Sequence, residues 1–280
     1  MPRQAISAAA CRTERTFWYS SVSTPSGSVL AYPPLALGLL PAPPCLGVDL
    51  AGLPTNPTGV AVLDAGRLVT LRSAGSDAEI VGLARALGMR TVVAVNAPLT
   101  LPRGRCCLDD ACRCRHDPGT RSRAIERQLA RERVPILATA LIKVLARRGI
   151  VLGATLRGAG FTVVEAYPYA TLRLLGLPSR GKRSREGRRL IQEALAPLVL
   201  GLDHPDATEH ELDAVVCALT ADLWLRGGCR LVGDPGEGQM VVPLAERATQ
   251  PEASRERAVV KRAAEAPAGY AAGAAGTVNT

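Results

Sequence analysis

Hydrophobic residues in the first half of the chain gather in short runs rich in β-branched side chains. Residues 46–52 and 58–63 form two such runs, with a proline- and asparagine-containing segment between them. Those residues are typical of turns, so the pattern predicts two consecutive strands. Residues 67–72 form a third run, and we therefore expect an antiparallel three-strand meander.

Helical spacing dominates the rest of the chain and is interrupted by further strand-like runs. Ser76 and Glu79 form a capping-box pattern, and Gly88 is a helix stop signal. Residues 91–95 predict a central strand buried on both faces. In chain order, the further predicted elements are helices at 121–133 and 136–145, the second ending at Gly149, a strand at 161–167, helices at 185–200 and 208–226, and a small strand at 240–243.

This order of elements indicates an α/β fold. We expect a mixed five-stranded sheet, with the three-strand antiparallel meander plus two parallel strands, flanked by helices. Residues 45–245 are predicted to form this domain, with a Cys- and Arg-rich insert at 103–120. The Ser-, Ala- and Pro-rich residues 1–44 are interpreted as a disordered or misassigned extension, and residues 246–280 as a disordered tail.

The net charge of +9 and a pI near 9.5 favour an anionic partner such as nucleic acid. Only Lys143, Lys182 and Lys261 are lysines, so the arginine excess is equally compatible with coding bias. No hydrophobic run approaches the roughly 20 residues of a membrane span, and the N-terminal pattern is not that of a signal peptide. We therefore expect a soluble, cytoplasmic protein whose 8 cysteines are thiols or metal ligands.

One carboxylate lies inside the first apolar run. Asp49 comes late in that strand, where an unpaired charge is costly, so it needs a metal, a cation or a backbone donor as partner. Alternatively, it caps a turn through local hydrogen bonds. Asn96 directly follows the strand at 91–95, and if the two strands are neighbours, Asp49 and Asn96 lie side by side.

A second acidic group lies on the helix predicted at 208–226. Glu209 and Asp213 are four residues apart and therefore point toward one side of that helix, with His210 beside them. Acidic residues at a helix start often only complement the helix dipole, which would explain Glu209 but not Asp213.

These segments together resemble a known family. They are Gly47-Val-Asp-Leu-Ala-Gly52, Val93-Ala-Val-Asn-Ala-Pro98, Val164-Glu-Ala-Tyr-Pro168 and Glu209-His-Glu-Leu-Asp-Ala214. In order and spacing they resemble the predicted nucleases called domain of unknown function 429, which have a ribonuclease H-like fold. The last segment also resembles the acidic, His-containing helix of RuvC-type resolvases. The resemblance covers about residues 45 to 245.

The resemblance implies a carboxylate cluster that binds two Mg²⁺ or Mn²⁺ ions and hydrolyses phosphodiester bonds of DNA or RNA. Asp49 would bridge the ions, Asp213 would be the ligand from the helix, and Glu165 or Glu209 would supply a further carboxylate. His210 would be a general acid or base, or else a solvent-facing helix residue. Family members that look active commonly have Asp where this chain has Asn96, so the site is either compensated by Glu165 or weakened.

Two further clusters have open interpretations. Lys182 and Arg183 belong to a basic segment, 180–189, which would contact a phosphate backbone or form a solvated loop. Four thiols and an imidazole, enough for a tetrahedral Zn²⁺ site, fall within the insert, although their spacing matches no familiar finger. The alternative is free thiols. These candidate ligands are Cys106, Cys107, Cys112, Cys114 and His116.

Three functions compete. The leading hypothesis is a metal-dependent nuclease, and the first alternative is a catalytically weakened or inactive nucleic-acid- or protein-binding relative. The second alternative, an actin-like phosphotransferase, requires a second copy of the fold with its own phosphate hairpin, and the sequence after residue 160 shows none. The sequence does not determine the oligomeric state.

Overall fold

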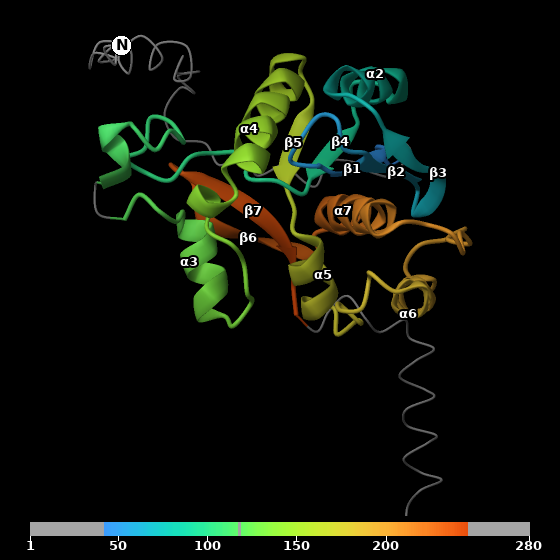
Figure 1. Ribbon diagram of the computed structural model, residues 1–280. Helices are drawn as coiled ribbons and strands as arrows, with labels where there is room; N and C mark the ends of the chain where they lie inside the picture. Colours follow the sequence, from blue (N-terminus) through green and yellow to red (C-terminus); the bar gives the residue numbers. More distant parts are fainter. Residues whose placement is uncertain (1–41, 117–118, 246–280) are drawn as a thin grey trace, which may run out of the picture.

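The computed structural model describes residues 42–116 and 119–245. The predictions for residues 1–41 and 246–280 therefore lie outside the described residues. The described chain forms one mixed sheet with six α-helices packed against it (Figure 1). Its seven strands have the order β3-β2-β1-β4-β5-β7-β6.

The first five strands follow the predicted order. β1 (Cys45–Asp49), β2 (Thr58–Asp64) and β3 (Arg67–Ala74) form the antiparallel meander. β4 (Val92–Val95) is parallel to β1, and β5 (Thr162–Glu165) is parallel to β4. The meander and both parallel strands are confirmed.

The prediction of five strands is wrong, because a hairpin extends the sheet beyond β5. β7 (Gly238–Pro243) contains the expected small strand and is parallel to β5, while β6 (Cys229–Asp234) pairs antiparallel with β7. β6 lies at the edge of the sheet, and Val232 is its only fully buried residue. Its sequence therefore lacks the apolar alternation that identifies a half-buried strand.

Helices cover both faces of the sheet. α2 (Asp77–Leu87) and α4 (Lys143–Gly158) pack on one face, and α3 (Ala124–Arg131) covers β6 and β7. The opposite face is covered by α5 (Pro168–Leu174), α6 (Arg185–Leu195) and α7 (Glu209–Leu225). Two short 3₁₀ turns complete the list, η1 (Arg113–His116) and η2 (Thr139–Leu141).

The helix predicted at 136–145 begins and ends later than expected. α4 runs through Gly149 as far as Gly158, so Gly149 is not a stop signal. A Cβ at Gly149 would lie 2.7 Å from both the Cβ of Ala97 and the carbonyl oxygen of Pro98. The glycine thus permits close packing of the helix on the segment after β4. In a single sequence, a glycine with this role looks the same as one that ends a helix.

Alternation along β1 decides which side chains meet α7. Leu46 and Val48 point into the core beneath α2 and α4, while Cys45 points into the core beneath α7. Asp49 therefore lies on the α7 side at the carboxyl end of its strand. Within the described residues, no helix is both long and apolar enough to cross a bilayer.

Candidate functional site

The site lies where the first turns of α7 rest on the ends of β1 and β2. A Cβ at Gly47 would lie 2.0 Å from the carbonyl oxygen of Ala214, and one at Gly59 would lie 2.1 Å from that of His210. The helix backbone thus lies directly against both strands, with no side chain between. This packing carries His210 and Asp213 to the end of β1.

Asp49 is nearly buried and has two side-chain partners. Its Oδ1 accepts a hydrogen bond from Nδ2 of Asn96 at 2.5 Å, and its Oδ2 lies 2.6 Å from Nδ1 of His210. β1 and β4 are neighbours, as expected, and this pairing brings Asn96 to Asp49. Nδ1 of His210 is engaged by this carboxylate, so Nε2 is the ring nitrogen left for other partners.

The charge of Asp49 acts on His210. The hydrogen bond from the imidazole to Asp49 raises the pKa of His210, and burial of the ring opposes this effect. The charges of Asp49, Glu209 and Asp213 raise the pKa further. The imidazolium is therefore favoured in the folded protein at pH values where an unperturbed histidine has lost its proton.

Asp213 pairs with Lys182, whose side chain is 14% exposed against 19% for Asp213. Burial raises the pKa of Asp213 to about 6, and the negative charge of Asp49 raises it as well, whereas Lys182 and His210 lower it. Burial is the main cause of the raised pKa, and the negative charge of Asp49 further disfavours ionisation of Asp213. Additional positive charge would therefore be favourable there.

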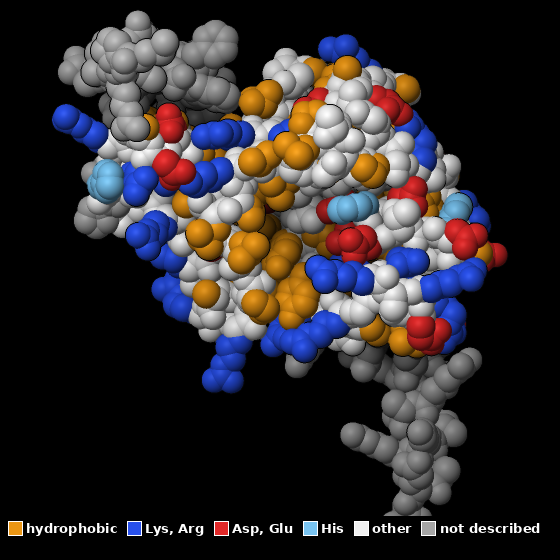
Figure 2. All heavy atoms as spheres, viewed as in Figure 1, with side chains coloured by type: hydrophobic (Ala, Val, Ile, Leu, Met, Phe, Trp, Pro, Cys, Tyr) orange, Lys and Arg blue, Asp and Glu red, His pale blue; other side chains and the backbone are white. Residues whose placement is uncertain are grey.

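The remaining predicted residues of this region lie at its margin. Glu209 is the first residue of α7, partly exposed, and acts on His210 through its charge. Arg183 is exposed, and its carbonyl oxygen accepts a hydrogen bond from Arg188 at 3.2 Å. In Figure 2, histidine and acidic side chains lie next to one another near the middle of the face, above a row of basic side chains.

Glu165 does not join Asp49 and Asp213. It pairs in register with Val95, which belongs to the core beneath α2 and α4, so its side chain points to the face opposite Asp49. There its carboxylate accepts from Nη2 and Nη1 of Arg123, at 2.6 and 2.7 Å, and from the backbone N–H of Leu99 at 3.0 Å. The placement of Glu165 in the same metal cluster is therefore corrected.

Arg123 was missed as a partner because it is distant in sequence from Glu165. Arg123 is only 1% exposed. Its Nε also donates a hydrogen bond of 2.8 Å to Glu126, which lies in the following helical turn. The Arg-x-x-Glu spacing across the start of α3 is the one signal in the sequence, and alone it suggests only a helix start.

The donor set near Asp49 fits a hard divalent cation in kind. It offers two carboxylates, from Asp49 and Asp213, with the side-chain amide of Asn96 and the imidazole of His210 beside Asp49. Oxygen ligands of this type suit Mg²⁺ and Mn²⁺. In this structure Lys182 supplies the positive charge beside Asp213, so a cation there would compete with the ammonium group.

Comparison with known proteins places these segments in one family. The family model described as "Protein of unknown function (DUF429)" matches residues 47–237, more than half of the chain. The chain belongs to this family. The matched range of the DUF429 domain begins in β1 and ends between β6 and β7, so it includes Asp49, Asn96, Lys182, His210 and Asp213. No match was found among curated proteins or among solved structures.

Proposed function

We propose that this DUF429 protein is a divalent-metal-dependent phosphodiesterase that hydrolyses nucleic acid. The observation that supports this most strongly is the convergence of Asp49, His210 and Asp213, from two elements 160 residues apart in sequence, at one end of the sheet. Carboxylates gathered beside a histidine suit metal-assisted hydrolysis. Glu165 has no part in this proposal because it is bound by Arg123 on the other face.

The topology supports a ribonuclease H-like core. Strand order β3-β2-β1-β4-β5, with an antiparallel meander followed by two parallel strands, is the arrangement expected from the resemblance. The acidic helix α7 packs across β1 and β2. The β6–β7 hairpin is then an addition to this core.

Asp49 and Asp213 would hold the metal, with Asn96 as a weaker neutral ligand. The chemistry that Mg²⁺ or Mn²⁺ supplies in such sites is activation of a water and neutralisation of phosphate charge. His210 would hold or release a proton at Nε2, because Nδ1 is engaged by Asp49. Its raised pKa favours the protonated form, which suits a group that donates a proton to a leaving oxygen.

Basic residues beside the site suit a polyanionic substrate. Lys182 already contacts Asp213, and the exposed side chain of Arg183 follows it directly. Contacts of this kind bind phosphates without reading sequence and weaken as the salt concentration rises. Nucleic acid is thus the substrate class that the charges support.

The test is cleavage of branched DNA, duplex DNA and RNA–DNA hybrid in Mg²⁺ or Mn²⁺. We expect Asp49→Asn and Asp213→Asn to abolish cleavage, and His210→Ala to lower it by about 10²–10⁴-fold. Asp206→Asn is the matched control, because Asp206 is 88% exposed and should leave the rate unchanged. Metal-dependent cleavage that survives in both site variants would overturn the proposal.

A second candidate is a nucleic-acid-binding protein without hydrolytic activity. It is favoured by the hydrogen bonds of Asp49, both of whose oxygens are engaged by other side chains, and by the neutral amide of Asn96. This candidate predicts that labelled oligonucleotides bind at low salt without cleavage in either metal. It also predicts that Asp49→Asn leaves their affinity unchanged.

A further inference from the structure

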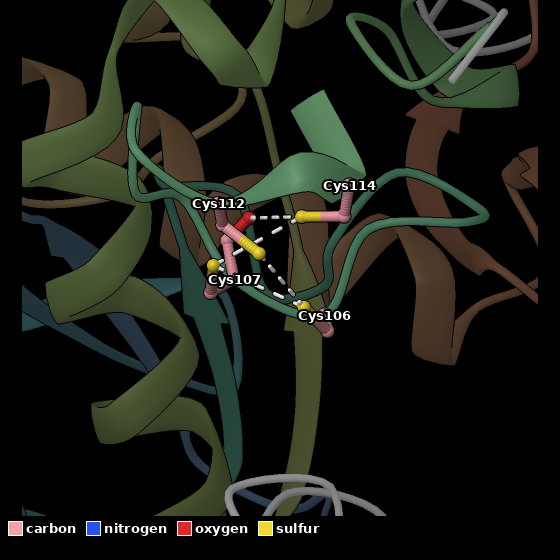
Figure 3. A group of neighbouring side chains, drawn as sticks. All are labelled: Cys106, Cys107, Cys112 and Cys114. Atoms are coloured by element: carbon pink, nitrogen blue, oxygen red, sulfur yellow. Dashed lines mark hydrogen bonds between the residues drawn. The ribbon is translucent and has the colours of Figure 1, made fainter. Parts of the chain in front are cut away.

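Four cysteines of the insert direct their sulfur atoms toward one point (Figure 3). The Sγ atoms of Cys106, Cys107, Cys112 and Cys114 all lie within 4.8 Å of one another. The Cys106–Cys112 separation is 3.5 Å, and the Cys106–Cys107 and Cys107–Cys114 separations are both 4.0 Å. His116, the fifth candidate, is exposed and does not belong to this group.

These separations match a shared metal ion. A tetrahedral site with Zn–S bonds of about 2.3 Å places its sulfurs about 3.8 Å apart. A disulfide instead requires about 2.05 Å. We propose that the four cysteines bind one structural Zn²⁺ ion that holds the insert in its observed conformation.

The insert needs such a cross-link because it has almost no apolar core. Between residues 103 and 116, Leu108 is the only buried apolar side chain, and the only regular element is the four-residue turn η1. A long loop of this kind within a compact domain is uncommon unless something else orders it. Small units that cannot bury enough apolar surface commonly use a metal for this purpose.

Basic residues around the cluster suit its charge. Four thiolates and Zn²⁺ together carry a net charge of −2, and Arg113 and Arg115 lie within one turn of the ligands. Arg105 is 6% exposed and donates from Nε to the carbonyl oxygen of Cys107 at 2.8 Å. The guanidinium of Arg105 therefore offsets part of the negative charge of a zinc–thiolate centre.

The oxidation state of the cysteines sets the condition for binding. Cys107, Cys112 and Cys114 carry thiols, whereas Cys106 is disulfide-bonded in this structure. The proposed site therefore forms in the reduced chain, where the thiolate of Cys106 is the fourth ligand. Zinc would then connect two ends of the insert, since two ligands precede Leu108 and two follow it.

An ordered insert has a further consequence for the surface. It lines a cleft of about 790 Å³, to which it contributes Arg105 and Arg115, and Arg127 of α3 and Lys143 of α4 line the same cleft. In Figure 2, basic side chains gather over this part of the molecule, where Figure 1 shows α3. Zinc would hold two of these positive charges in place.

The experiment measures zinc by mass spectrometry in full-length protein purified under a phosphine reductant. We expect about one zinc per chain, and less than a tenth of that in Cys107→Ser/Cys114→Ser. Cys229→Ser is the matched control, because Cys229 lies on β6 and its thiol donates a hydrogen bond to the carbonyl oxygen of Thr220. This variant should retain the zinc. Asp49→Asn should also retain it, which separates this site from the acidic one.

A second measurement covers the case in which the double variant fails to fold. Wild-type protein treated with a chelator should become sensitive to trypsin within residues 103–121 while its circular dichroism stays nearly unchanged, and added Zn²⁺ should restore resistance. Zinc-free wild-type protein under reducing conditions would overturn the proposal. Zinc retained by the double variant would overturn it as well.

Discussion

Nδ1 of His210 lies 2.6 Å from Oδ2 of Asp49, although the two residues are 161 positions apart in sequence. The contact joins the end of β1 to the first turn of α7. Because this hydrogen bond raises the pKa of His210, the protonation of the imidazole depends on its contact with Asp49.

Asp49→Asn should lower the pKa of His210 in metal-free protein. Because the pKa of His210 in the folded protein lies above the usual 6.5, protonation of His210 stabilises the fold. This stabilisation is complete below pH 6.5 and is lost as the pH rises through the folded-state pKa. The variant lacks the contribution, so its stability deficit should be largest in acid and should shrink above that pKa. Histidine ring resonances in NMR titrations, together with urea unfolding at several pH values, measure both effects.

His204→Gln is the control for this titration. His204 lies in the loop before α7, so its replacement removes one histidine signal from the NMR spectrum and leaves Asp49 unchanged. An unchanged His210 pKa in Asp49→Asn would show that the hydrogen bond does not form in solution.

Gly47→Ala should be strongly destabilising. The new methyl group would lie 2.0 Å from the carbonyl oxygen of Ala214 and 2.4 Å from the backbone nitrogen of Ala218, so α7 must move away from β1. Overpacking costs about 1–3 kcal/mol, and more where backbone must move, so we expect a loss of about 3 kcal/mol. Urea denaturation measures the loss, and the His210 resonance should shift as its contact with Asp49 lengthens.

Gly82→Ala is the matched control for that substitution. Gly82 lies within α2 with nothing within 4 Å of an added Cβ. Alanine is favoured over glycine in a helix, so this variant should gain about 0.5–1 kcal/mol. Equal effects of the two substitutions would contradict the close packing of α7 on β1.

The sequence was sufficient to predict the parts of the fold that depend on local pattern. The apolar runs of β1 to β5 were identified correctly, as were Ser76 and Gly88 as the caps of α2. Ser76 accepts from the N–H of Glu79, whereas the Glu79 carboxylate accepts from the backbone N–H of Gly75. Asn96 lies beside Asp49, as expected for the case in which the two strands are neighbours. The edge strand β6 was missed because an edge position needs little apolar alternation.

The direction of a side chain across the sheet was harder to predict. Glu165 ends β5 in an apolar context much as Asp49 ends β1, and nothing local shows that they point to opposite faces. Only the register of β5 with β4 decides this, and only the fold brings Arg123 to Glu165. Pairing between residues distant in sequence therefore limits what one sequence reveals about the site.

Arg123→Ala should destabilise the protein by about 3–5 kcal/mol, because it leaves the nearly buried carboxylates of Glu165 and Glu126 without their cation. Metal affinity at Asp49 should not change in any condition where the variant remains folded. Calorimetric titration with Mn²⁺ and urea unfolding separate the two effects.

Arg189→Ala is the surface control for this pair. Its ion pairs with Glu186 and Glu193 are more than half exposed, so the change in stability should stay within about 1 kcal/mol. A loss of Mn²⁺ affinity in folded Arg123→Ala would instead link Glu165 to the acidic site.

Asn96→Asp should strengthen divalent-cation binding while weakening the metal-free fold. Nδ2 of Asn96 donates to Asp49 at 2.5 Å, and an aspartate there replaces the donor with a second carboxylate in direct contact. Two like charges at that distance repel unless a proton or a cation lies between them. In metal-free protein we therefore expect lower stability at neutral pH, which is recovered on acidification. Calorimetric titration with Mn²⁺ should give a Kd at least tenfold lower than that of the wild type.

Asn96→Ala, which removes the donor without adding charge, should lower stability but not tighten Mn²⁺ binding. Equal Mn²⁺ affinity in Asn96→Asp and wild type would show that this corner of the sheet does not bind metal, and the hydrolytic proposal would lose its main support.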